Sequence, residues 1–382
     1  MARLRVGVQG PLFVSRPAAE AFNRISYLSA AINRVDSFWV PDHLNGILPR
    51  SLWQQKYCGA VRLVPSPDAY LEPWTMLGHL AARNRLGRMR LGVAVTDTGR
   101  RNPAVTAQAA ATLNLLTRGR SILGIGPGER EGNEPYGVDW SRPVARFEEA
   151  IATIRALWGS HGELVNRDSP YFPLRNAVFD LPPYQGKWPQ MWIAGHKPRM
   201  LRAVGRYADG FLPAYAQRPQ DYAERLRAVR DAASDAGRDP LTIVPAMWLP
   251  VVTGKSRRDV DEALESELIK ISGLNVPDEV FKRHGAQHPM GSGFSGVQDL
   301  MPHDIDEQTA LSYIEQIPTA VLREASLHGT PEEVLEQAAQ WRDSGVRYFV
   351  LINMSPLQRS LRKGLASARY FNSIVRGLQR LE

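Results

Sequence analysis

The chain is poor in cysteine, with Cys58 alone among 382 residues. A single cysteine excludes an internal disulfide and a cysteine-rich metal site, so we expect a reducing compartment. Cys58 is not expected to act as a nucleophile, because residues 54–60 (QQKYCGA) contain neither a histidine nor a helix start that would lower the pKa of its thiol.

Long apolar runs and a leader sequence are also missing. No stretch approaches the roughly eighteen uninterrupted apolar residues that a membrane-spanning helix needs. Residues 1–8 (MARLRVGV) lack the charged and then apolar pattern of a secretory leader. We therefore expect a cytoplasmic protein without an integral membrane segment, whose contact with the inner membrane surface could only be peripheral.

The motifs of several enzyme and binding classes are absent. There is no Gly-x-Ser-x-Gly elbow and no P-loop, which argues against hydrolase and kinase chemistry. A net charge of +8 favours anionic partners such as phosphorylated cofactors. The arginine pairs at 100–101 and 257–258 lack the aromatic-interleaved pattern of nucleic-acid binders. We interpret them as solvated basic surface and expect no nucleic-acid partner.

What the sequence does contain is an alternation of short β-branched runs with amphipathic segments, which indicates parallel α/β structure. This number of strand–helix units favours one TIM barrel, a (β/α)8 fold over residues 1–382, rather than a doubly wound sheet. Helices are expected at 103–117 and 143–158, with an irregular connector up to residue 188. The strand candidates are residues 4–9, 36–43, 89–96, 121–126, 191–195, 210–214, 243–252 and 346–353.

Two insertions interrupt this pattern, one at about residues 44–85 after the second strand and one at about 272–329 after the seventh. Long loops in a compact domain usually form lids or binding walls. The second insertion contains His284, His288 and His303, but no acidic partner completes a known metal signature, and we expect no metal ion.

The second strand ends in a carboxylate and an imidazole, Asp42 and His43. In a TIM barrel the active site lies where strands end and loops begin. Histidine can donate or accept a proton near neutral pH, which makes His43 a candidate catalytic residue. The alternative is that His43 merely caps the barrel through a hydrogen bond to a neighbour.

The fourth strand ends in residues 124–129 (GIGPGE), where Glu129 takes the place of the third glycine of a dinucleotide fingerprint. A Rossmann interpretation therefore fails. Glycines at a strand end allow the backbone to approach a flat ligand, and Glu129 could pair with His43 or act as an acid. An ordinary tight turn with a solvated carboxylate explains the same residues.

The fifth strand ends in residues 194–198 (AGHKP), where small residues precede a helix. Backbone amides at a helix N-terminus can hold a phosphate. A purely structural turn accounts for the pattern equally well, and both interpretations stay open.

Three motifs resemble the F420-dependent branch of the bacterial luciferase-like enzymes: residues 36–43 (DSFWVPDH), 95–108 (VTDTGRRNPAVTAQ) and 124–129 followed by Asn133. The resemblance extends over the whole barrel. It implies deazaflavin F420 as the cofactor, with FMN as the alternative, in the barrel mouth. The ring contacts that it implies are Asp42, Ala94, Val95, Thr96, Gly126, Pro127, Gly128 and Asn133, and the phosphate region is Ala194, Gly195 and His196.

The same resemblance carries further expectations. Family members often have a non-proline cis peptide in the third strand, expected here near Ala94 and Val95. Relatives acting on sugar phosphates have a lysine clamp and a tryptophan where this chain has Gln217 and Ile47. These departures indicate an uncharged, more apolar substrate.

Within that branch, residues 72–78 (EPWTMLG), 130–137 (REGNEPYG) and 288–291 (HPMG) are most similar to reductases of long-chain keto-diol lipids. The resemblance implies a ketone reductase that uses reduced F420, with catalytic roles for His43 and Glu129, and a homodimer. We expect His43 to supply the proton and Glu129 to hold His43 or the ring. An FMN-dependent monooxygenase and a non-catalytic flavin-binding or lipid-binding barrel remain the alternatives.

Overall fold

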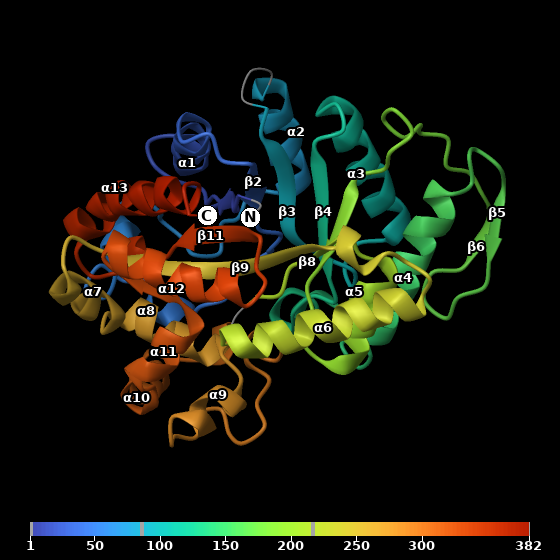
Figure 1. The fold of residues 1–382 in the computed structure, drawn as a ribbon. Coiled ribbons are helices and arrows are strands. Elements are labelled where there is room, and N and C mark those ends of the chain that lie inside the picture. Colours follow the sequence, from blue (N-terminus) through green and yellow to red (C-terminus); the bar gives the residue numbers. More distant parts are fainter. Residues whose placement is uncertain (1–2, 85–87, 215–217, 382) are drawn as a thin grey trace.

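A closed parallel barrel forms the centre of the molecule (Figure 1), in a computed structural model that describes residues 3–84, 88–214 and 218–381. Each strand pairs with the next in the order β1-β2-β3-β4-β7-β8-β9-β11, and β11 pairs again with β1. All eight expected strands are present, and the TIM barrel is confirmed. They are β1 (Arg5–Gln9), β2 (Ser37–Val40), β3 (Arg90–Asp97), β4 (Ser121–Gly126), β7 (Gln190–Ile193), β8 (Gly210–Phe211), β9 (Val244–Thr253) and β11 (Tyr348–Asn353).

Helices surround the barrel and cover the outer faces of the strands (Figure 1). The helix expected at 143–158 is α4 with the same bounds, and its apolar face is fully buried through Phe147, Ile151 and Ile154. The helices are α1 (Ala21–Ile32), α2 (Pro73–Arg83), α3 (Pro103–Leu116), α4 (Pro143–Trp158), α5 (Pro198–Tyr207), α6 (Pro219–Asp235), α7 (Arg257–Leu264), α8 (Glu267–Ile271), α9 (Asp278–Arg283), α10 (Glu307–Gln316), α11 (Thr319–Ala325), α12 (Pro331–Asp343) and α13 (Leu361–Leu378).

Two tryptophans, Trp39 and Trp192, pack inside the barrel with their ring centroids 5.3 Å apart. Glycines on neighbouring strands make room for them. A Cβ on Gly92 would lie 2.4 Å from the Trp39 ring, and one on Gly210 would lie 2.6 Å from the Trp192 ring. The strands can therefore close around large rings only because glycines stand opposite them.

Three strands lie outside the expected set. β5 (Val165–Arg167) and β6 (Leu174–Ala177) form an antiparallel hairpin at the edge of the molecule, within the stretch that the sequence indicates as a connector. These strands are short and largely solvent-facing, so they carry no apolar alternation that could reveal them. β10 (Leu327–Gly329) pairs with the end of β9.

A second apolar cluster joins residues 44–85 to residues 272–329. Leu52, Tyr57 and Cys58 pack there with residues such as Leu274 and Phe281. Burial raises the pKa of the Cys58 thiol to about 11, in agreement with the expectation that it is no nucleophile. In Figure 1, α9, α10 and α11 lie together on one side of the barrel. None of the helices described combines the length and the apolar composition that crossing a bilayer requires.

Two glycine substitutions should have opposite effects on stability. At Gly124 in β4, a Cβ would lie 2.0 Å from the Val93 carbonyl oxygen, so Gly124→Ala should lower the free energy of unfolding by about 1–3 kcal/mol. Gly78 lies within α2, where an added methyl group would meet no described atom within 4 Å, so Gly78→Ala should raise the free energy of unfolding by about 0.5–1 kcal/mol. Urea unfolding measures both changes. Equal stability of the two variants would contradict this account of the barrel.

Candidate active site

Asp42 lies just after β2 as a buried anion bound by two guanidinium groups. Arg100 Nη2 donates to Asp42 Oδ1 at 2.8 Å, and Arg101 Nε donates to Oδ2 at 2.9 Å. The Thr96 hydroxyl donates to Oδ2 at 2.6 Å. Burial alone would raise the pKa of Asp42, but Arg100 and Arg101 outweigh burial and lower it. Asp42 is therefore a permanent charge that ties the loop after β3 to the end of β2.

The interpretation of residues 100–101 as solvated basic surface was wrong. The Arg100 and Arg101 side chains are only 10% and 23% exposed, because both turn inward to Asp42. The pair at 257–258 differs, since Arg257 and Arg258 are largely exposed. A local pattern cannot show that a distant buried carboxylate binds an arginine pair.

The glycine-rich turn after β4 is held by hydrogen bonds from the Asn133 side chain. Asn133 Nδ2 donates to the Asp97 carboxylate and, at 2.8 Å, to the Glu129 carbonyl oxygen. Gly128 has a φ of +90°, and a Cβ there would lie 2.0 Å from Asp97 Oδ2. Only glycine fits this position, and the resulting turn places Glu129 on the side of His43.

Two carboxylates face the same ring nitrogen of His43. Its Nδ1 atom is 3.4 Å from Glu129 Oε2 and 3.3 Å from Glu131 Oε1. Burial alone would lower the pKa of His43, but the charges of Glu129 and Glu131 raise it to about 9. Burial raises the pKa of Glu129. The geometry thus keeps the imidazole protonated at neutral pH, and it brings together the two residues that the sequence proposed as catalytic.

Glu131 was missed by the sequence analysis. It lies in a short 3-10 turn at Arg130–Gly132 and looks like one more polar loop residue, although its side chain is only 2% exposed. Its Oε2 atom has no hydrogen-bond partner within the described part of the chain. The only available signal was its spacing of two residues from Glu129, which can place two carboxylates around one cation.

The three side chains of this cluster also have the chemistry of metal ligands. One ligand atom from each of His43, Glu129 and Glu131 lies within 4.8 Å of the others. The histidines considered for a metal site from sequence have separate partners. His284 Nε2 is 2.9 Å from Glu324, His303 Nε2 is 2.9 Å from Asp68, and His288 packs between two phenylalanine rings.

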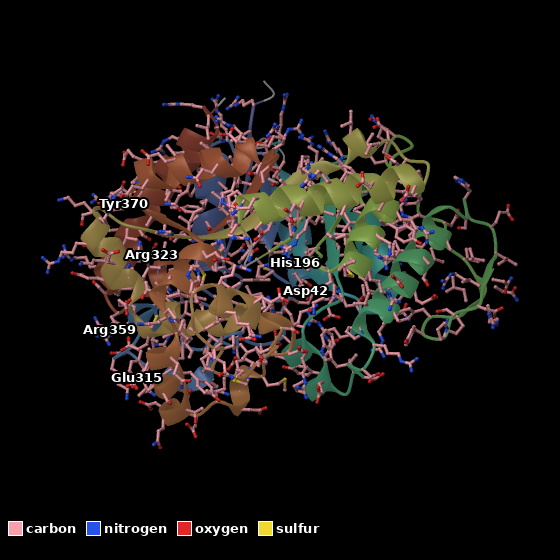
Figure 2. All side chains as sticks on the ribbon, turned by 60° about the horizontal axis from the view of Figure 1, so that its bottom comes forward. Asp42, His196, Glu315, Arg323, Arg359 and Tyr370 are labelled. Atoms are coloured by element: carbon pink, nitrogen blue, oxygen red, sulfur yellow. The ribbon has the colours of Figure 1, made fainter. Side chains whose placement is uncertain are left out.

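A cavity of about 1060 Å³ opens at the strand ends beside His43. Most of the predicted cofactor contacts line it, namely Asp42, Ala94, Val95, Gly126, Pro127, Gly128, Ala194, Gly195 and His196. Thr96 and Asn133 are fully buried behind the wall and support Asp42 and the Glu129 turn. In Figure 2, Asp42 and His196 are labelled near each other in the middle of the view.

The cavity wall has the features that a flat ring needs. The Ala94–Val95 peptide is cis, as expected, at the point where the register of β3 and β4 shifts. A Cβ on Gly126 would lie 3.0 Å from Val95 Cγ2 and 3.9 Å from Ala194 Cβ, so glycine keeps this space open. The buried Asn133 Oδ1 has no partner among the described atoms. These observations fit a ring cofactor at this wall.

The start of α5 closes another side of the cavity. Burial, together with Arg225, lowers the pKa of His196 to about 4, so this imidazole is neutral at physiological pH. Gly195 permits close packing, since a Cβ there would lie 2.8 Å from Met200 Cβ. Among the described residues, the cap residue Lys197 makes no side-chain cap hydrogen bond. Both the structural and the phosphate-binding interpretation fit this geometry, and the second stays a prediction.

The sequence-based expectation of an apolar substrate rests on two positions, Ile47 and Gln217. Ile47 lines the cavity, as its place in the loop after β2 predicts. Gln217 lies outside the described residues.

The chain is a TIM barrel with a cavity at its strand ends, and His43 lines this cavity. The model of the family described as luciferase-like monooxygenase matches residues 33–348, and the chain belongs to this family.

Curated relatives narrow the comparison. The chain is 70% identical over 381 residues to the phthiodiolone/phenolphthiodiolone dimycocerosates ketoreductase of Mycobacterium sp. strain JLS, with 100% of both chains covered. It is 58% identical over 382 residues to the protein of that name from Mycobacterium bovis BCG, again over 100% of both. It is 31% identical to an F420-dependent glucose-6-phosphate dehydrogenase of Microbacterium testaceum, over 73% of this chain and 75% of that one.

Solved structures share the fold. An F420-dependent secondary alcohol dehydrogenase in complex with an F420–acetone adduct superposes with a TM-score of 0.71 at 18% identity, covering 98% of this chain and 99% of that one. The coenzyme F420-dependent tetrahydromethanopterin reductase of Methanopyrus kandleri gives a TM-score of 0.71 at 18% identity, covering 97% and 98%.

Removing one carboxylate should lower the pKa of His43. A charge-assisted hydrogen bond contributes about 1.5–3 kcal/mol, so Glu131→Gln should lower this pKa by about one to two units. The imidazolium, which persists up to about pH 9 in the parent protein, would then lose its proton at lower pH. NMR titration of the His43 ring measures the change. Glu134→Gln, at an exposed pair with Arg130, is the control, and an unchanged midpoint in Glu131→Gln would refute the assignment.

Proposed function

We propose that the protein is an F420-dependent ketoreductase that reduces the keto group of phthiodiolone-type lipids to give phthiotriol-type products in phthiocerol dimycocerosate biosynthesis. The observation that carries the proposal is full-length identity of 70% to a relative named as a phthiodiolone ketoreductase. The protonated His43 at the rim of the cavity supplies the chemistry that such a reduction needs.

The cofactor would occupy the slot at the ends of β2, β3 and β4. When bound there, reduced F420 supplies a hydride to the carbonyl carbon of the substrate. Gly126 and the Ala94–Val95 peptide would lie against its ring, and the start of α5 near Gly195 would receive its phosphate region. The F420 dependence named for the dehydrogenase relative at 31% identity supports this choice over FMN.

His43 would provide the proton that a carbonyl oxygen requires as it becomes an alkoxide. Glu129 and Glu131 face the Nδ1 atom of His43 and hold the ring in place, which leaves Nε2 for the substrate. After donation His43 must be reprotonated. Donation from Nε2 leaves the proton on Nδ1, the atom that faces Glu129 and Glu131, so the replacement proton must reach Nε2 from the cavity side.

Because the proposed substrate is a lipid, the proposal includes contact between the protein and a lipid surface. The exposed face of α1 carries Ile25, Leu28 and Ile32, and the neighbouring α13 has basic and no acidic residues over Leu361–Leu378. An apolar face beside basic residues is typical of helices that lie on anionic membranes. We place the protein peripherally on the inner membrane surface.

The membrane contact can be tested with vesicles. Ile32 is 80% exposed on α1, so Ile32→Glu should reduce binding to vesicles of anionic phospholipid about tenfold in a sedimentation assay. Leu241 is 76% exposed between α6 and β9, and Leu241→Glu is the matched control. Equal vesicle binding by both variants, or none by the parent protein, would remove the peripheral placement.

A homodimer is the second structural part of the proposal. Val105 and Leu116 expose apolar surface at the two ends of α3, where a symmetric contact would bury it.

The cofactor and the proton donor can be tested together. Titration should show tighter binding of F420 than of FMN, and adding a phthiodiolone lipid should reoxidise reduced F420, followed by its absorbance band. His43→Gln should lower kcat by about 10²–10⁴-fold with little change in F420 affinity, because His43 acts on the substrate oxygen. His284→Gln, which alters a distant ion pair with Glu324, should leave kcat unchanged.

The alternatives predict other results in the same experiment. Preference for FMN with oxygen consumption would indicate a monooxygenase. Binding of cofactor and lipid without turnover would indicate a non-catalytic barrel. Parallel loss of kcat and F420 affinity in His43→Gln would move His43 from proton donor to cofactor ligand.

A further inference from the structure

The cavity does not end at the slot beside His43. It continues as an arm between α1 and α13, which lie next to each other on the outside of the barrel (Figure 1). From α1 the arm is lined by residues that include Phe22, Ile25 and Ala30, and from α13 by Leu365, Ala368 and Phe371. The described lining that these two helices contribute contains no charged side chain.

Two polar bridges link the two helices. The Ser29 hydroxyl donates to Asn372 Oδ1 at 3.0 Å, and Arg376 Nη1 donates to Asn33 Oδ1 at 2.9 Å. Each bond pairs polar atoms of one helix with polar atoms of the other. With a largely apolar lining that carries no charge among the described residues, the arm suits a hydrocarbon.

An aromatic wall leads from the catalytic cluster to the arm. The His43 ring centroid is 5.6 Å from that of Tyr70, and the Tyr70 centroid is 4.5 Å from that of Phe13. Phe13 and Phe22 both line the cavity. The site of proton transfer and the hydrocarbon-compatible arm thus share one continuous wall.

We propose that the arm between α1 and α13 holds one long alkyl chain of the substrate while its keto group lies beside His43. This inference rests on the proposed function, because it assumes a lipid ketone. Ile25 and Leu365 are exposed at the rim, so the arm is open at its outer end and a chain longer than the arm can extend into the lipid surface. The cavity would then favour substrates with an apolar alkyl chain, whatever the total length of that chain.

A matched pair of tryptophan substitutions tests the arm directly. Ala368 lines the arm at an exposed position on α13, and Ala366 lies two residues away outside the lining. Ala368→Trp should weaken binding of a fluorescent long-chain polyene methyl ketone to the cofactor-free protein at least about tenfold, since several methylenes lose contact at up to about fourfold each. Ala366→Trp should bind it like the parent protein.

Turnover with reduced F420 separates this inference from the proposed function. Ala368→Trp should raise KM for a long-chain methyl ketone with little change in kcat, and it should leave kcat/KM for butanone unchanged. No turnover of any ketone by the parent protein would refute the proposed function, while the binding difference between the two variants would still support the arm. Equal binding by both variants, or equal loss with long and short ketones, would overturn the arm.

Discussion

The site depends on one buried charge, that of Asp42. Taking a carboxylate out of water is costly, and removing a partner from such a group typically costs about 3–5 kcal/mol. Here Arg100 and Arg101 provide the compensating charge from the loop after β3, so this loop and the end of β2 can adopt only arrangements that keep them together. His43 follows Asp42 in the chain, and its position is set by the same contact.

The charge state of His43 results from two opposing effects of its location. Burial favours the neutral imidazole, whereas the carboxylates within 3.4 Å favour the imidazolium. The effect of the carboxylates is larger, so the pKa of His43 is raised. The outcome requires Glu129 to point at His43, which the Gly128 turn and the Asn133 amide arrange. The protonation of His43 thus depends on the backbone turn at Gly128 as well as on the acidic residues.

Local patterns predicted the parts of the fold whose cause is local. Helix α4 shows its buried face as a repeat in the sequence, and the barrel strands show β-branched runs before glycine or proline. The β5–β6 hairpin has almost no buried side and gave no such signal. The same holds for the site. Asp42, His43 and Glu129 follow the ends of strands, so local patterns could indicate them.

Contacts between distant residues were beyond that reasoning. The arginines at 100–101 looked solvated because nothing near them in sequence reveals a buried acceptor, and Glu131 lay unmarked in a polar loop. The arm between α1 and α13 arises from how two helices at opposite ends of the chain meet, which no motif encodes. The cis peptide at Ala94–Val95 was anticipated only through the family resemblance.

The two ends of the cavity differ in polarity, and this difference can sort two ligands that must meet at His43. Near His196, a neutral imidazole beside Arg225 and the start of α5 favour an anionic group. Toward α1 and α13 the walls offer mostly hydrocarbon and no charged side chain among the described lining residues. A charged cofactor tail would lose its counter-charges in the apolar arm, and an alkyl chain would gain nothing beside a guanidinium. On the proposed function, each ligand therefore has one favourable orientation, and that orientation brings hydride, ketone and imidazolium to the same point.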